Sequence, residues 1–164
     1  MIIDGHDGSA LRDLIDKQEL YELVVRYCRA VDRADEELLR SCYHPDATQD
    51  HGAYSGPIPG LVDHLKKRAM DPARGPLQHA VTNCSFELDG DRAFGESYIR
   101  TVMTDAQGRA QPGFGRYVDR FERRDGRWGI AHRQVIIDVP RPGMDADEFV
   151  AGYRDRRDPS YRRA

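Results

Sequence analysis

The first third of the chain carries apolar residues at the spacing of an amphipathic helix. These residues are Leu20, Leu23, Val24, Tyr27 and Val31. Their period predicts one long helix, with Ser9 as its N-cap. The first ten residues, 1–10, lack the period, and we expect them to form a loose arm.

Two shorter helices are expected after the first. A helix over roughly 35–43 must end before Pro45, because the residue that precedes a proline disfavours the helical region. The segment 56–60 (GPIPG) is expected to be a loop. Leu61, Leu65 and Arg68 then lie on a third helix, which cannot continue past Asp71 and Pro72.

After Pro76 the pattern changes from helical to alternating. Four runs rich in Val, Ile, Tyr, Phe or Thr are predicted strands, and they cover residues 77–88, 93–104, 113–123 and 127–139. Turn-forming sequences separate these runs, so the strands should pair as an antiparallel meander. Beyond Pro140 we expect a short helix, capped by Asp145 and extending to about Arg154, and then a solvated tail, 155–164.

Helices followed by antiparallel strands indicate an α+β fold. The sheet can bury its apolar face only by curling around the helices, and such a sheet encloses a pocket. With 164 residues and no internal repeat, the chain (1–164) is expected to form a single domain.

Charge and composition exclude several classes of partner. A net charge of −3 is unlike the basic excess of nucleic-acid-binding proteins, and the apolar runs are too short to cross a bilayer. We therefore expect a soluble, cytoplasmic protein with neither a nucleic-acid nor a membrane partner. Cys28, Cys42 and Cys84 are odd in number and widely spaced, which is not typical of a disulfide scaffold or a zinc site.

Motifs for nucleotide binding and serine hydrolysis do not occur, since GxGxxG before a helix, GxxxxGK[ST] and GxSxG are all absent. His44 with Asp46, and Asp50 with His51, lie in a polar stretch where such side chains are usually solvated. We therefore predict no metal and no cofactor.

Asp32 and His79 are candidates for acid–base chemistry. Asp32 lies at the edge of the apolar stripe of the first helix, where it either caps a helix or acts as a partly desolvated base. His79 lies near the start of the first long strand, where a histidine is more often a hydrogen-bonded core residue than a catalyst. A catalytic role for His79 requires a carboxylate that fixes the tautomer of its ring, and Asp32 is the candidate.

Arg133 alternates with Val135 and Ile137 on the last long strand, so these side chains should share the inward face. An inward arginine either pairs with Asp119 or Asp32, or holds a leaving group or oxyanion. Further donors are available, although each is equally credible as ordinary packing. These donors are Tyr27, His51, Tyr54 and Tyr117.

Three segments carry a family resemblance: ELVVRYCRAVDRADEELLRSCYHPDA, QHAVTN and GRYVDRFERRDGRWGIAHR. With the order of elements, they resemble the SnoaL-like branch of the nuclear transport factor 2-like superfamily, which includes scytalone dehydratase, bile-acid 7α-dehydratase and hexachlorocyclohexane dehydrochlorinase. The resemblance covers roughly residues 11–140. It implies a cone-shaped fold in which three helices pack in a curved antiparallel sheet.

The resemblance also implies roles for individual residues. Asp32 and His79 match the Asp–His pair of the lyase members, and Arg133 matches an arginine that lines the dehydrochlorinase cavity. Tyr27 matches a tyrosine that the dehydratases place near substrate, whereas His51 stands where the bile-acid dehydratase has a tyrosine.

The leading hypothesis is a cofactor-independent lyase of aromatic-compound catabolism, in which Asp32 and His79 take a proton from a small hydrophobic cyclic or aromatic substrate. Arg133 and Tyr27 would assist catalysis. The residues expected to bind substrate are His51, Tyr54, Tyr117 and Val135. An isomerase of the polyketide-cyclase or ketosteroid-isomerase kind and a noncatalytic ligand-binding domain stay open as alternatives. We also expect a homo-oligomer, a dimer or trimer, because an open sheet leaves edges to be covered.

Overall fold

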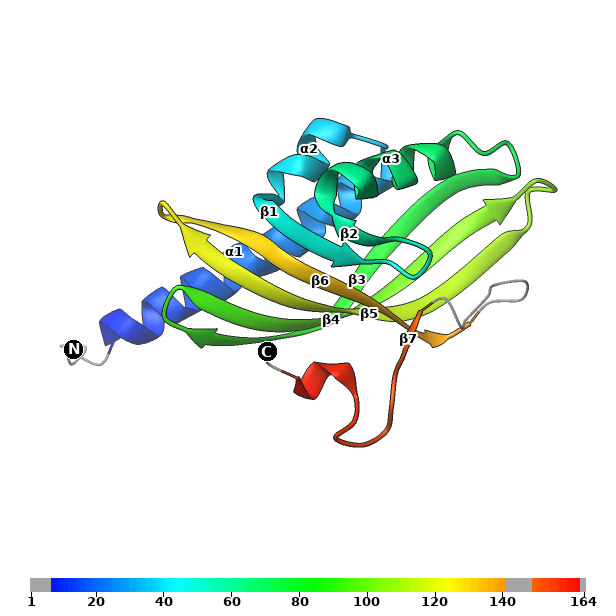
Figure 1. Ribbon diagram of the computed structural model, residues 1–164. Coiled ribbons are helices and arrows are strands. Elements are labelled where there is room, and N and C mark those ends of the chain that lie inside the picture. Colours follow the sequence, from blue (N-terminus) through cyan, green and yellow to red (C-terminus); the bar gives the residue numbers. More distant parts are fainter. Residues whose placement is uncertain (1–6, 141–148, 163–164) are drawn as a thin grey trace.

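The computed structural model describes residues 7–140 and 149–162, and its fold is α+β, as the sequence predicts. The α-helices of these residues are α1 (Asp7–Asp32), α2 (Glu36–Ser41) and α3 (Ile58–Ala69). The strands are β1 (Tyr43–Asp50), β2 (Ser55–Pro57), β3 (Arg74–Asp89), β4 (Arg92–Asp105), β5 (Ala110–Arg124), β6 (Arg127–Val139) and β7 (Val150–Ala151). The helices pack against one curved sheet in the expected cone-shaped arrangement (Figure 1).

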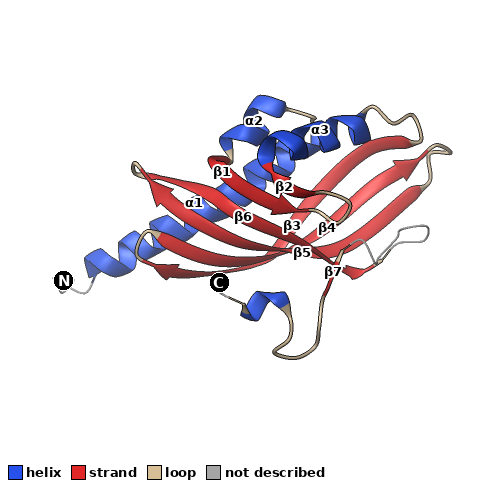
Figure 2. Cartoon of the chain, viewed as in Figure 1, coloured by secondary structure: helices blue, strands red, loops and turns tan. Residues whose placement is uncertain are grey.

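The sheet has the order β2-β1-β6-β5-β4-β3, and β7 pairs with β6 outside this path. Strands β3 to β6 each pair antiparallel with the next, which confirms the predicted meander. In the described residues the sheet stays open, with β2 and β3 at its edges. The α-helices lie on one side of the long strands and the C-terminal segment lies on the other (Figure 2).

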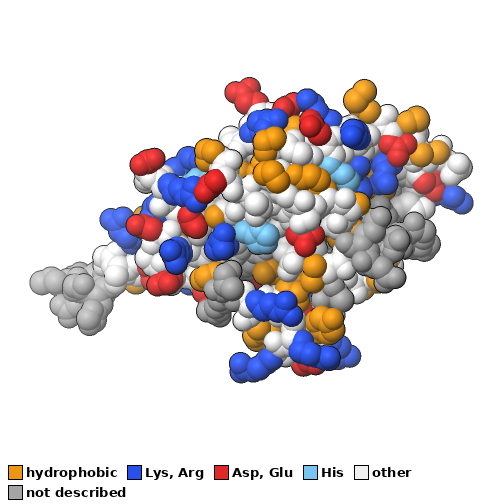
Figure 3. All heavy atoms as spheres, viewed as in Figure 1, with side chains coloured by type: hydrophobic (Ala, Val, Ile, Leu, Met, Phe, Trp, Pro, Cys, Tyr) orange, Lys and Arg blue, Asp and Glu red, His pale blue; other side chains and the backbone are white. Residues whose placement is uncertain are grey.

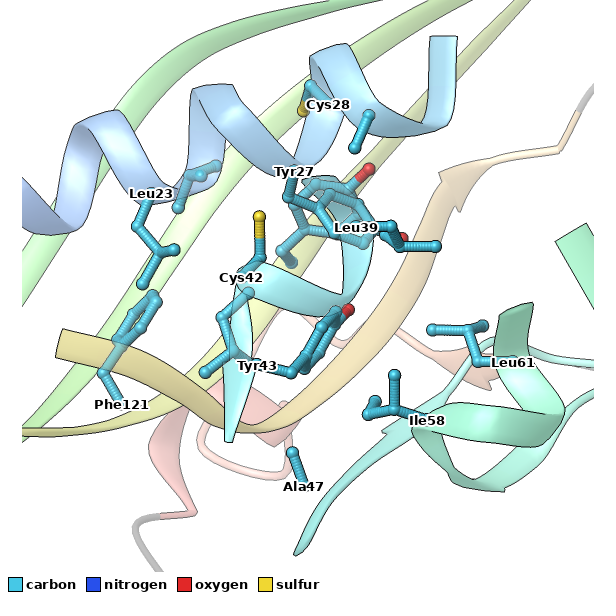
Figure 4. Packing of buried hydrophobic residues seen from close by; sticks show 14 of the residues in the cluster. Leu23, Tyr27, Cys28, Leu39, Cys42, Tyr43, Ala47, Ile58, Leu61 and Phe121 are labelled. Atoms are coloured by element: carbon cyan, nitrogen blue, oxygen red, sulfur yellow. The ribbon is translucent and has the colours of Figure 1, made fainter. Parts of the chain in front are cut away.

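The core lies between α1 and the sheet. The four most buried of the predicted apolar positions on α1 are Leu20, Leu23, Val24 and Tyr27. They belong to one cluster with Tyr43 from β1 and Phe121 from β5 (Figure 4). Because burial of each such side chain contributes about 1.5 to 3 kcal/mol, this face of α1 fixes the helix against the strands.

The predicted ends of the first two helices differ from the observed ones. α1 begins at Asp7, so Ser9 lies inside the helix instead of capping it, and residues 7–10 are not a loose arm. Asp35 does cap α2, since its side chain accepts a 3.0 Å hydrogen bond from the backbone N–H of Leu38. α2 ends at Ser41, before the predicted end, because Tyr43 already pairs with β6.

Strands β1 and β2 occupy a segment that the sequence analysis treats as turn and loop. β1 has a polar sequence with a proline, Pro45, as its third residue, so its local pattern gives no strand signal. It forms because it runs parallel to β6 and buries Tyr43, Ala47 and Gln49. The predicted loop 56–60 is also wrong: residues 55–57 form β2, and α3 begins at Ile58.

The predicted C-terminal helix and solvated tail are wrong over the residues that the structure describes. Residues 145–148, including the predicted cap Asp145, lie outside the described part of the chain. Val150 and Ala151 form β7, parallel to β6, and not a helix. The predicted solvated tail 155–164 contains a 3₁₀-helix, Pro159–Tyr161, preceded by Asp158, which is 2% exposed.

Arg116 holds this tail on the outer face of the sheet. Its guanidinium donates to both carboxylate oxygens of Asp158, at 3.0 and 2.9 Å. It also binds Asp138 from β6 and Glu96 from β4. One buried arginine therefore joins two neighbouring strands to the C-terminal segment.

The surface carries both signs of charge. Basic and acidic side chains lie interspersed across the face shown in Figure 3. No helix among the described residues is long and apolar enough to span a membrane.

We predict that Arg116→Met lowers the free energy of unfolding by about 3 kcal/mol at neutral pH, because three carboxylates lose their shared cation. Arg116 and two backbone N–H groups hold the pKa of Asp158 far below its usual range, although burial opposes them. Because the pKa of Asp158 is lower in the folded state than the value of about 3.9 in the unfolded state, its ionised form stabilises the fold above about pH 3.9. This stabilisation is lost as the pH falls through the pKa of the folded state. Chemical denaturation should therefore show a larger wild-type advantage at pH 6 than at pH 3.

The matched control is Arg157→Met, because the Arg157 side chain is 73% exposed and its ion pair, with the half-exposed Asp155, lies at the surface. It should change stability by less than about 0.5 kcal/mol. An Arg116 variant as stable as this control would show that the tail is not held by the charge cluster.

Candidate active site

Asp32 and His79 lie in direct contact. Asp32 is the last residue of α1, and His79 lies on β3. The Oδ1 atom of Asp32 is 2.5 Å from His79 Nδ1, and its Oδ2 accepts a 2.9 Å hydrogen bond from the backbone N–H of His79. One carboxylate therefore holds both the ring and the backbone of the histidine.

This contact determines which ring nitrogen of His79 is available. A carboxylate accepts a hydrogen bond from the Nδ1–H group, which leaves the lone pair on Nε2. The two side chains are only 10% and 7% exposed, so water weakens the pairing little. The arrangement therefore leaves the unprotonated Nε2 atom of His79 as a candidate proton acceptor.

Two adjoining cavities meet at this pair. The smaller, of about 90 Å³, is lined by His79, and the larger, of about 510 Å³, is lined by Asp32. Their shared wall consists of Val31, Leu65, Arg68, Leu77 and Met103. The walls are mostly apolar, which suits a small hydrophobic molecule.

His51 lies in the smaller cavity with His79. Its Nδ1 atom is 2.9 Å from the amide nitrogen of Gln49. Burial lowers the pKa of His51 to about 3, and the nearby charges of Arg68, His64, His79 and Arg133 act in the same direction. The ring is therefore neutral over the physiological range.

Gln49 is a site residue that the sequence analysis missed. It is fully buried, and it contacts both Tyr27 and Tyr43 besides His51. No local signal marks it, because it lies in the polar sequence of β1 and becomes buried only through the pairing with β6.

Arg133 and Tyr27 lie behind the cavity wall and not on it. Arg133 donates two 2.7 Å hydrogen bonds to Asp119. The sequence analysis gave this ion pair as the alternative to binding a leaving group or an oxyanion. Its guanidinium lies over the rings of Tyr27 and Tyr117, 4.1 and 4.0 Å from their centroids. Its Nη1 atom is buried and has no partner among the residues that the structure describes.

The remaining candidates separate into two groups. Tyr117 and Val135 line the smaller cavity. The Tyr54 hydroxyl donates to the backbone carbonyl of Pro57, and Tyr54 lines neither cavity. Burial raises the pKa of both Tyr27 and Tyr117, so their hydroxyl groups stay protonated.

The side chains considered as metal ligands have other partners. His44 Nε2 contacts the backbone oxygen of Glu122 at 2.8 Å, and Asp46 pairs with Arg124. Across residues 7–140 and 149–162, no three His, Cys, Asp or Glu side chains gather in a group that could hold a metal ion.

Comparison with known proteins identifies relatives of the chain. The family model described as a SnoaL-like domain matches residues 12–134. No curated protein matches the chain. A solved protein of unknown function from Mycobacterium tuberculosis is 26% identical, with a TM-score of 0.69, and the match covers 87% of this chain and 80% of that one.

Two further solved structures share the fold at lower identity. Hexachlorocyclohexane dehydrochlorinase LinA-type3 from Novosphingobium barchaimii is 20% identical, with a TM-score of 0.71, over 82% of this chain and 96% of that one. A putative scytalone dehydratase from Novosphingobium aromaticivorans is 14% identical, with a TM-score of 0.70, over 77% and 87% of the two chains.

We predict that Asp119→Asn destabilises the protein by about 3 to 5 kcal/mol, because it leaves the Arg133 charge buried without a counter-ion. The double variant Arg133→Met with Asp119→Leu should recover most of this loss, since it removes both charges. Urea denaturation of the single and double variants measures the difference. Equal losses in the two would mean that packing, and not the unpaired charge, determines stability at this position.

Proposed function

Because the chain belongs to the SnoaL-like family, whose model matches residues 12–134, we propose that it is a cofactor-independent lyase. The observation that carries the proposal is the contact of Asp32 with His79 Nδ1 at the boundary of the two cavities. The contact leaves His79 Nε2 free to accept a proton inside a mostly apolar cavity.

The reaction is a proton abstraction followed by elimination. The Nε2 atom of His79 takes a proton from a carbon of the substrate, and the electron pair of that C–H bond forms a new double bond. A chloride departs from the neighbouring carbon, or a hydroxide departs as water after it takes the abstracted proton back from the His79 imidazolium. Asp32 stabilises the imidazolium that forms, and it keeps the ring in the productive tautomer.

The substrate is a small hydrophobic cyclic or aromatic compound. Val135 and Tyr117 supply apolar wall to the smaller cavity, and exclusion of water strengthens each polar contact inside it. The names of two structural relatives, a dehydrochlorinase and a putative dehydratase, agree with an elimination. Arg133 would contribute through its buried positive charge, one layer behind the Tyr117 ring.

We predict that Asp32 and His79 act as one unit. Against a panel of cyclic β-hydroxy ketones and chlorinated cyclohexanes, His79→Ala and Asp32→Asn should each lower kcat by on the order of 10²-fold or more. The double variant should lose little more than either single variant. The control is His132→Ala, because His132 lies on the same sheet, bonds to Thr48 and lines neither of the two cavities.

Two results would contradict this account. Full turnover by His79→Ala would exclude His79 as the base. Variants that lose about 1 to 3 kcal/mol of stability while turnover is spared would show a purely structural pair. A product with the same mass as the substrate would favour the isomerase alternative.

We also propose that the chain forms a homo-oligomer. The outer face of the sheet exposes Tyr98 and Val102 of β4, each at least 44% accessible. Light scattering at micromolar concentration should give at least twice the 18.7 kDa of one chain, and Val102→Glu should lower that mass. A mass of one chain for the wild type would refute the prediction.

A further inference from the structure

Gln49 makes three hydrogen bonds in the core beside the cavity. Its Oε1 atom accepts from the hydroxyl of Tyr43. Its Nε2 atom donates to the hydroxyl of Tyr27, at 3.2 Å, and to His51 Nδ1, at 2.9 Å. Both amide protons and the carbonyl oxygen are therefore used, so the orientation of the amide is determined by its partners.

This orientation fixes the tautomer of His51. An amide N–H group can donate only to an unprotonated ring nitrogen, so Nδ1 carries the lone pair and the proton lies on Nε2. Nε2 has no hydrogen-bond partner among the residues that the structure describes, and the ring lines the smaller cavity. His51 thus presents a neutral N–H donor inside the cavity.

The cavity consequently holds two imidazoles in opposite tautomers. Asp32 holds His79 with its proton on Nδ1 and its lone pair on Nε2. Gln49 holds His51 with its lone pair on Nδ1 and its proton on Nε2. One ring can accept a proton while the other donates a hydrogen bond to a developing negative charge.

We propose that His51 Nε2–H binds a carbonyl oxygen of the substrate, that Gln49 is the residue that positions it, and that the substrates are compounds with an acidic C–H next to that carbonyl. This inference rests on the proposed lyase function. His79 Nε2 takes the proton, the electron pair of the C–H bond moves to the carbonyl oxygen as an enolate, and His51 binds that oxygen. When the enolate collapses, the carbonyl re-forms and the leaving group departs from the β-carbon.

The fixed charge state of His51 supports a carbonyl substrate over a chlorinated hydrocarbon. The charges that face the ring come from α3, in Arg68 and His64, from β3, in His79, and from β6, in Arg133. With its pKa lowered to about 3, His51 stays neutral during turnover and is a poor proton donor to a leaving hydroxide. It is well suited to bind an oxyanion, whereas a carbon–chlorine bond offers it only a weak acceptor.

The tautomers can be measured without any substrate. Two-bond ¹H–¹⁵N spectra of the full chain should show His51 protonated at Nε2 only, from pH 5 to pH 9, and the neutral form of His79 protonated at Nδ1. Gln49→Glu should move the His51 proton to Nδ1, because a carboxylate only accepts. Gln134→Leu is the control, since Gln134 also lies in the sheet and bonds to Asp50 outside the cavities, and it should leave both tautomers unchanged.

Binding of 4-nitrophenolate, whose oxygen mimics an enolate, tests the donor itself. His51→Phe and Gln49→Leu should each raise its Kd about tenfold, and Gln134→Leu should not. The inference would be overturned if wild-type His51 were protonated at Nδ1 or charged above pH 5. It would also be overturned if 4-nitrophenolate failed to bind the wild type, or bound equally well to His51→Phe. None of these results bears on the dependence of turnover on His79, so the inference can fail while the lyase proposal stands.

Discussion

The hydrogen bonds from Asp32 to His79 connect the end of the long helix to the first long strand. They link the hydrophobic packing of α1 to the position of the imidazole, because Asp32 is the last residue of the helix whose apolar face packs in the core. The backbone N–H of His79 holds one carboxylate oxygen, which leaves the other for the ring. The same two bonds thus fix an element of the fold and the tautomer of the candidate base.

A layer of buried polar groups lies next to this pair. Gln49, Tyr27 and Arg133 are completely buried, and each is hydrogen-bonded or stacked on an aromatic ring. Unpaired groups of this kind would cost several kcal/mol in so dry an environment, so their mutual contacts fix the rotamers around the cavity. The Nη1 atom of Arg133 is the exception in this layer, because it has no hydrogen-bond partner among the described residues. It keeps a positive charge close to the cavity without lining it.

The sequence predicts the parts of the fold that local pattern determines. The long helix, the α3 segment and the four-strand meander follow from periodicity and turn residues, and the pairing of Asp32 with His79 follows from the family resemblance. β1 could not be predicted, because its polar sequence is ordered only by the parallel pairing with β6, and Gln49 was missed for the same reason. The anchored tail was also missed, since the buried Asp158 pairs with Arg116, 42 residues away in sequence.

Exchange of a substrate proton with solvent tests the central claim most directly, because it isolates proton abstraction from the loss of any leaving group. A cyclic ketone without a leaving group, such as 2-tetralone, is incubated with the protein in D₂O and followed by proton NMR. The account predicts that the wild type accelerates deuterium incorporation next to the carbonyl, and that His79→Ala abolishes this acceleration. Acceleration that persists in His79→Ala would contradict the assignment of His79 as the base.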